Sequence, residues 1–153
     1  MAGSYGQRRR LIIIDTDVLS ELMKPAQLRS PSVTLWMRAQ QPERIFTTTI
    51  TLAEILAGIA ILPDGGGRKK KMLTIAEQIF STLLFRRILS FDEPAARVYA
   101  DIVTERRIRG LHKAPLDFQI AAVAKARGMS IATRNTSDFE DAGIEVINPW
   151  SDE

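Results

Sequence analysis

Leu11-Ile12-Ile13-Ile14-Asp15-Thr16-Asp17, near the start of the chain, joins an apolar run to two aspartates. The unbroken apolar run, mostly β-branched, is typical of a strand that is buried on both faces, as the strands of parallel sheets are. Open parallel sheets bind their ligands beyond the carboxyl ends of the strands. The run therefore predicts a strand of a parallel sheet and places two carboxylates, Asp15 and Asp17, at the edge where a ligand would bind.

Downstream of this strand, short apolar segments alternate with longer segments whose apolar residues recur at helical spacing. This alternation, without tight hairpin signals, indicates an α/β fold with a parallel sheet and helices on both of its faces. We predict further strands over residues 44–49, 88–91, 130–133 and 144–147. We predict a short helix from Asp15 to Met23, a second that begins at Pro31 with Ser30 as its cap, and a third that begins at Thr51 in a capping box with Glu54. A fourth helix is predicted over residues 68–86. A fifth follows Asp92 as far as Arg109, and a sixth begins at Pro115.

The chemistry of this 153-residue chain is restricted by its single histidine and its lack of cysteine. These counts exclude Fe–S clusters, thiolate zinc sites, cysteine nucleophiles, three-histidine zinc sites and a two-histidine ribonuclease mechanism. Any metal must therefore be held by carboxylates, and all-oxygen sites favour Mg²⁺ or Mn²⁺. Those ions point to a phosphate-containing substrate if the protein is an enzyme.

The length fits one domain, which we place at residues 11–150 behind a basic leader at residues 1–10.

The chain has 21 Lys and Arg residues against 18 Asp and Glu residues. More than half of these basic residues fall in clusters, which either attract a polyanion or are solvated helix ends. The apolar run after the leader is too short for a signal peptide or a membrane span, so we expect a cytoplasmic protein. The clusters are Arg8–Arg10, Arg68–Lys71, Arg86–Arg87 and Arg106–Arg109.

Acidic residues recur after the predicted strands and in the first turns of the predicted helices, and each has a structural explanation. Asp15 or Asp17 caps the first helix, Glu54 is the partner of Thr51 in the capping box, Asp117 is stabilised by a helix dipole, and Asp138 belongs to a second capping box over residues 137–140. The topology, however, brings these acids to one edge of the sheet. Two carboxylates 5 Å apart repel by roughly 3 kcal/mol at an effective dielectric near 20, so such a group favours a bound cation.

Four segments in order resemble the successive motifs of PIN-domain nucleases, and most closely those of the VapC-type toxins of bacterial type II toxin–antitoxin pairs. The resemblance runs from about residue 11 to Trp150. The segments are Leu11 to Leu22, Thr51-Leu52-Ala53-Glu54, Asp117-Phe118-Gln119-Ile120-Ala121-Ala122 and Ala132-Thr133-Arg134-Asn135-Thr136-Ser137-Asp138-Phe139, with a closing Ile147-Asn148-Pro149-Trp150.

The resemblance implies a three-layer α/β/α sandwich and an endoribonuclease that depends on Mg²⁺ or Mn²⁺. It implies an acidic metal pocket formed by Asp15, Glu54, Asp117 and Asp138, in which Glu54 is a ligand or positions the water. It also implies an RNA substrate, a cognate antitoxin whose tail occupies the groove, and a homodimer or larger toxin–antitoxin assembly, with no membrane.

Polar neighbours of the acids are expected to orient them from behind. The candidates are the Thr16 and Thr133 hydroxyls, the Asn135 amide and Asp17, whose carboxylate stands where the family often has asparagine. Arg134 is expected either to hold an RNA phosphate or to form a surface ion pair. Trp150 is expected to pack in the core rather than to stack on a base.

Two other functions fit parts of the sequence. A strand that ends in Asp-x-Asp also opens haloacid-dehalogenase-like phosphatases, in which Asp15 would be the nucleophile and Asp17 the acid. The chain lacks a convincing late Gly-Asp with an acidic partner, which disfavours that class. The other alternative is a module without catalytic activity that binds RNA or protein through its basic clusters.

Overall fold

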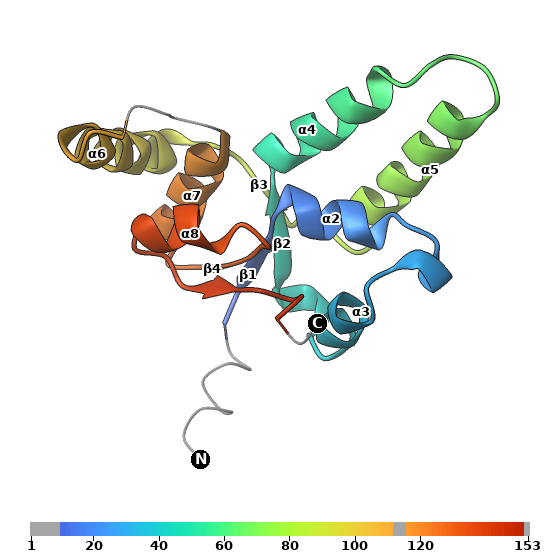
Figure 1. Ribbon diagram of the computed structural model, residues 1–153, viewed down its shortest axis with the longest axis horizontal. Coiled ribbons are helices and arrows are strands. Elements are labelled where there is room, and N and C mark those ends of the chain that lie inside the picture. Colours follow the sequence, from blue (N-terminus) through green and yellow to red (C-terminus); the bar gives the residue numbers. More distant parts are fainter. Residues whose placement is uncertain (1–9, 112–115, 152–153) are drawn as a thin grey trace.

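A computed structural model describes residues 10–111 and 116–151, and in it five strands form one parallel sheet (Figure 1). The strand order is β3-β2-β1-β4-β5, and every neighbouring pair is parallel. The predicted parallel α/β fold is therefore confirmed. The strands are β1 (Ile12–Ile14), β2 (Ile45–Thr48), β3 (Ile88–Leu89), β4 (Ser130–Ala132) and β5 (Val146–Ile147).

The alternation of side chains along β1 divides the interior into two cores. Ile13 packs in one core with Ile131 of β4, whereas Ile12 and Ile14 point to the opposite face and pack in the other. Helices cover both faces, so the molecule has the expected three layers. The helices are α2 (Thr16–Leu22), α3 (Pro31–Arg38), α4 (Thr49–Ala60) and α5 (Arg68–Ser81) around the second core, and α6 (Glu93–Ile108), α7 (Leu116–Arg127) and α8 (Thr136–Asp141) around the first.

Several helix ends follow directly from local sequence. Ser30 caps α3 through a hydrogen bond from the Val33 N–H, and Asp92 caps α6 through one from the Ala95 N–H. Gly110 follows α6 with a φ of 79°, the left-handed conformation that glycine adopts without steric cost. Short polar caps and glycine act on neighbouring backbone, which is why these ends were predictable.

The predicted helix over residues 68–86 is too long, because α5 ends at Ser81. The chain then turns until Arg86, which has a left-handed φ of 59°, and the Arg87 guanidinium donates to the Ile45 carbonyl of β2 over 3.0 Å. Local turn bonds connect these residues, such as that from the Arg87 N–H to the Leu84 carbonyl over 2.9 Å. The strands are also shorter than predicted by one or two residues at several ends.

Some predictions lie outside the described residues, namely the greater part of the basic leader and the helix start at Pro115. In the described ranges, no helix is long and apolar enough to cross a membrane.

Candidate metal centre

The carboxyl ends of β1 and β4 form the point where the chain topology changes direction. The chain passes from β1 to β2, which lies on one side of β1, and β4 lies on the other side of β1. Open α/β sheets bind ligands in the crevice at such a point. Asp15 stands there as the N-cap of α2, and its N–H donates to the Ala132 carbonyl of β4 over 3.0 Å.

Asp15 is a buried carboxylate held by hydrogen bonds. Its Oδ1 accepts from the Thr16 N–H over 2.7 Å, and its Oδ2 accepts from the Thr133 hydroxyl over 2.8 Å. Burial and the nearby charge of Asp17 raise the pKa of Asp15 to about 7, with a smaller contribution from Asp117, although these two hydrogen bonds act to lower it. The site therefore holds a negative charge at considerable electrostatic cost.

Asp17 connects the two loops that meet at this crevice. Its Oδ2 accepts from the Arg134 N–H over 2.8 Å and lies 3.3 Å from the Thr133 hydroxyl, while its Oδ1 accepts from the Val18 N–H over 2.7 Å. The carboxylate thus helps cap α2 and also fixes the segment that follows β4. Both predicted alternatives for Asp17, cap and neighbour of the metal site, are compatible with these contacts.

The prediction that Glu54 belongs to a capping box with Thr51 is wrong. Helix α4 begins at Thr49, and its N-cap is Thr48, whose hydroxyl accepts from the Thr51 N–H over 3.2 Å. Glu54 consequently lies in the second turn of α4 rather than the first. The structural role that would have explained this glutamate is absent.

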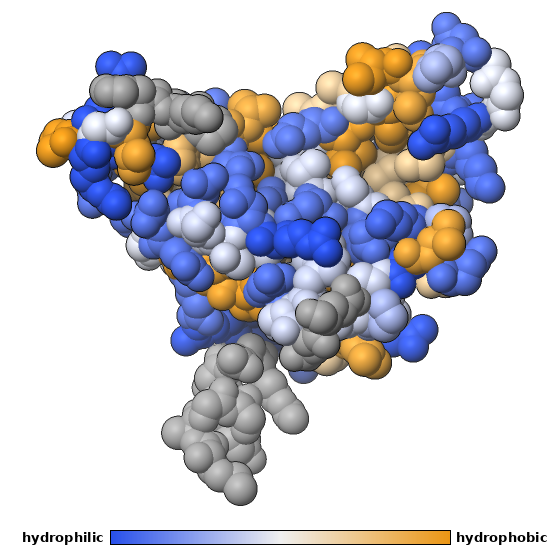
Figure 2. Space-filling model, in the orientation of Figure 1, coloured by the Kyte–Doolittle hydropathy of each residue, from blue (hydrophilic) through white to orange (hydrophobic). Residues whose placement is uncertain are grey.

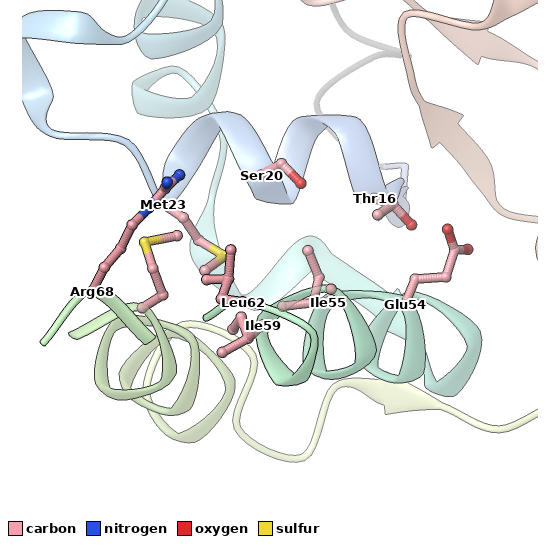
Figure 3. Close-up of a pocket in the computed structure, with 10 residues that line it drawn as sticks. Thr16, Ser20, Met23, Glu54, Ile55, Ile59, Leu62 and Arg68 are labelled. Atoms are coloured by element: carbon pink, nitrogen blue, oxygen red, sulfur yellow. The ribbon is translucent and has the colours of Figure 1, made fainter. Parts of the chain in front are cut away.

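Glu54 instead extends toward the crevice beside Thr16, as Figure 3 shows. Its Oε1 atom is buried and has no hydrogen-bond partner. Burial and the charge of Asp117 raise the pKa of Glu54, and a hydrogen bond from Thr16 opposes that rise. A buried carboxylate oxygen without a hydrogen bond is unfavourable, so we expect Glu54 Oε1 to bind a group from outside the protein.

Asp117 and Asp138 are brought together by one amide group. Asn135 Nδ2 donates to Asp117 Oδ2 over 2.9 Å and to Asp138 Oδ2 over 3.1 Å. Burial raises the pKa of Asp117 and the charges of Asp138 and Asp17 raise it further, against the effect of the Asn135 hydrogen bond. The predicted capping box over residues 137–140 is wrong, because Asn135 is the N-cap of α8 and makes no side-chain capping bond.

Arg134 lies beside the acids and stacks on an aromatic ring. Its guanidinium carbon is 4.6 Å from the centroid of the Trp150 ring. Trp150 itself is 7% exposed and belongs to a core, so the prediction that it packs rather than stacks on a base agrees with the structure.

Two features of the site were not predicted from the sequence, namely the stacking of Arg134 on Trp150 and the Thr48 cap. The signal for the cap was the run Thr47-Thr48-Thr49 at the end of a strand.

The chemistry of the predicted acids fits a hard divalent cation. All the candidate donors are carboxylate oxygens, the pKa shifts of Asp15, Glu54 and Asp117 each include a neighbouring carboxylate charge, and Glu54 Oε1 is unpaired. The side chains are not closed around one point, however. Across residues 10–111 and 116–151, no three Asp, Glu or His side chains are placed to hold a single ion.

A groove leads away from this centre between α2, α4 and α5. It has a volume of about 290 Å³, with Thr16 and Glu54 at one end and Arg68 at the other, and apolar side chains between them (Figure 3). Figure 2 shows hydrophilic side chains across the middle of this face and apolar ones gathered on the arm formed by α4 and α5. The acidic centre thus opens onto a mainly apolar surface.

Comparison with known proteins places these features in a family. Residues 12–145 match the PIN domain family. VapC ribonuclease Y4jK of Sinorhizobium fredii is 39% identical over 140 residues, which cover 92% of this chain and 98% of that protein. Toxin FitB of Neisseria gonorrhoeae is 38% identical over 143 residues, which cover 93% of this chain and all of that protein.

The fold agrees with the sequence match. The crystal structure of FitAcB from Neisseria gonorrhoeae superposes with a TM-score of 0.82 at 36% identity, over 92% of this chain and 99% of that one. The matched residues include β1, β2 and β4 and the helices α2, α4, α7 and α8, so they contain all of the acids described above. The chain belongs to the PIN domain family.

Proposed function

We propose that this protein is a Mg²⁺- or Mn²⁺-dependent endoribonuclease that hydrolyses RNA phosphodiester bonds and acts as the toxin of a toxin–antitoxin pair. The observation that carries the proposal is the placement of Asp15. It is buried at the β1–β4 crevice among other carboxylates, where its ionised form is unfavourable and a bound cation would stabilise it. A relative named as a ribonuclease and another named as a toxin support the two halves of the proposal.

Each acid has a proposed part in this reaction. Asp15, Asp117 and Asp138 would draw together to hold the divalent ion, and Glu54, with its unpaired Oε1, would either join them or orient the attacking water. The bound ion would supply a water of lowered pKa and neutralise charge that develops on the phosphate. Thr133 and Asn135 would orient the carboxylates through the hydrogen bonds they already donate to them. Thr16 would act on Glu54 in the same way.

Arg134 would bind the RNA backbone beside the scissile bond. One face of its guanidinium is covered by Trp150, which restricts the side chain but leaves its N–H groups at the edge. No ion pair of Arg134 occurs within the described residues, and a fork of N–H donors matches the oxygens of a phosphate. A pre-oriented guanidinium of this kind contributes binding without base preference.

The phosphatase alternative fits the site less well. Asp17 would have to donate a proton to a leaving group, yet both of its oxygens accept backbone N–H bonds, an arrangement that suits an ionised acceptor. Trapping an aspartyl-phosphate on Asp15 would nevertheless favour that class, because the nuclease reaction needs no covalent intermediate.

The nuclease proposal is tested by incubating the purified protein with RNA and Mg²⁺ or Mn²⁺ and sequencing the ends of the fragments. We expect Asp15→Asn and Asp117→Asn to abolish cleavage with an unchanged circular dichroism spectrum. Asp101→Asn, at an exposed position on α6, is the matched control and should cleave normally. Cleavage that persists in excess EDTA, or in Asp15→Asn, would contradict the metal mechanism.

The toxin half of the proposal predicts a cognate antitoxin, and the groove beside Glu54 is the surface we assign to it. Gly58 lines this groove, and a Cβ built there meets no atom within 4 Å. Gly58→Phe should fill the groove and weaken binding of the protein encoded by a neighbouring small reading frame, while Gly58→Ala should bind it normally. Expression of this protein in the cytoplasm without the antitoxin should arrest cell growth, because the RNA substrate lies there. Continued growth would contradict the toxin half of the proposal.

A further inference from the structure

Arg106 joins the three helices that cover one face of the sheet. It lies in the last turn of α6, and its side chain is only 11% exposed. The guanidinium carbon is 4.1 Å from the centroid of the Phe118 ring on α7, and Nη1 is 3.5 Å from Asp141 Oδ2 on α8. A single charged side chain thus contacts both neighbouring helices.

The environment of Arg106 is costly for a charge. Its Nε and Nη1 atoms are buried without a hydrogen-bond partner, and the 3.5 Å contact with Asp141 is an ion pair too long for a good hydrogen bond. The ring of Phe118 offsets only part of this cost. Apolar residues of similar volume often replace such buried charges without loss of stability, so packing alone does not explain an arginine here.

Both contacts of Arg106 lie next to residues of the acidic centre. Phe118 directly follows Asp117 in the first turn of α7, and Asp141 lies three residues after Asp138 on the same side of α8. Asn135 holds Asp117 and Asp138 together from the other direction. Helix α8 has only six residues, so each of these contacts matters for where Asp138 lies.

We propose that Arg106 is a positioning residue that sets the separation of Asp117 and Asp138 and thereby the affinity of the acidic centre for Mn²⁺. The inference rests on the proposed metal-dependent function. Arg106 touches neither acid, and it acts through the Phe118 ring and the Asp141 carboxylate.

The test compares Mn²⁺ binding by titration calorimetry with thermal stability. Arg106→Met keeps an unbranched side chain without the charge, and we expect its Mn²⁺ affinity to fall on the order of tenfold while its Tm equals or exceeds that of the wild type. Arg107→Met, at the exposed neighbouring position, is the matched control and should bind Mn²⁺ like the wild type. A purely structural role for Arg106 would change Tm and leave the affinity measured well below Tm unaltered.

Asp141→Asn provides an independent route to the same result. Its side chain is 44% exposed, so the fold should tolerate the change. We expect a weaker Mn²⁺ affinity, and a loss in the double variant with Arg106→Met that is smaller than the two single losses combined, because both changes break the contact between Arg106 and Asp141. Wild-type affinity in either single variant overturns the role of Arg106 and leaves the nuclease proposal standing. Failure of the wild type itself to bind Mn²⁺ overturns both.

Discussion

The Thr133 hydroxyl donates a hydrogen bond to Asp15 Oδ2 over 2.8 Å and so joins the carboxyl ends of β4 and β1. Thr133 is fully buried, and its hydroxyl also accepts from the Asn135 N–H over 3.1 Å. Asn135 in turn bridges Asp117 and Asp138. A single threonine therefore connects the most buried acid to the segment that orients the other two.

Replacing Thr133 tests this connection. Thr133→Val keeps the shape but leaves Asp15 Oδ2 without its donor, which should destabilise the fold by about 1–3 kcal/mol. It should also weaken Mn²⁺ binding by about 10-fold to 100-fold, as loss of a partner of a metal ligand does. Thr133→Ser retains the hydroxyl and is the control. Denaturant unfolding and Mn²⁺ titration check both, and equal affinities for the valine and serine variants would argue against the role.

Asp15 should destabilise the metal-free protein as the pH rises. Its pKa is raised from 3.8 to about 7 in the folded state, so the folded protein binds the proton more tightly than the unfolded chain. The resulting loss of stability begins above the unfolded pKa and is complete above the folded one. We therefore compare the free energy of unfolding of Asp15→Asn with that of the wild type in EDTA. The advantage of the variant should be larger at pH 8 than at pH 4 by a few kcal/mol. A pH-independent difference would contradict this.

Glu21 should show the opposite pH dependence. Burial acts to raise its pKa, but hydrogen bonds from Lys24 and from the Ser30 N–H, the latter over 2.7 Å, lower it below 4.5 overall. A lowered folded pKa contributes stability above the unfolded value, and this stability is lost as the pH falls through the folded pKa. Glu21→Gln should thus be less stable than the wild type by about 1–3 kcal/mol at pH 7. In urea unfolding, the two proteins should converge as the pH falls below the folded pKa of Glu21.

Thr48 and Glu54 should respond in opposite ways, because the first caps α4 and the second does not. Thr48→Ala removes the acceptor for the Thr51 N–H and should cost about 1–2 kcal/mol. Glu54→Gln removes a charge whose pKa is raised, so the metal-free protein at pH 7 should be at least as stable as the wild type. Thermal unfolding in EDTA measures both, and destabilisation by Glu54→Gln would contradict the unfavourable burial of its charge.

Arg134 should contribute to RNA binding through a phosphate. Arg134→Ala should weaken binding of all RNA sequences to a similar extent and reduce the slope of log K against log salt by about one. Arg97→Ala, at an exposed arginine paired with Glu93 on α6, should leave that slope unchanged. Fluorescence anisotropy measures both salt slopes when each change is made in the cleavage-deficient Asp15→Asn protein. An unaltered slope for Arg134→Ala would mean that the guanidinium only stacks on Trp150 and does not bind a phosphate.

The accuracy of the sequence-based expectations depended on the range of the interactions involved. The caps Ser30 and Asp92 were predictable because each side chain bonds a backbone N–H three residues away. The cap of α4 was assigned to Thr51 instead of Thr48, because several adjacent threonines offer the same local chemistry. The predicted helix over residues 68–86 ran past the end of α5 at Ser81, and the segment after α5 is tied to the sheet by a bond between Arg87 and Ile45, 42 residues apart.

The strands, the parallel sheet and the types of residue available to bind a metal could be inferred from the sequence, since burial patterns and composition are local properties. The polar group that supports each acid depends instead on the tertiary fold. Thr133 and Asp15 are 118 residues apart, and they meet because β4 pairs directly with β1. Asp17 acts on the pKa of Asp15 from two residues away in the chain, but burial is the larger cause of the raised pKa. That burial depends on how the strands and helices pack around Asp15, which no local pattern encodes.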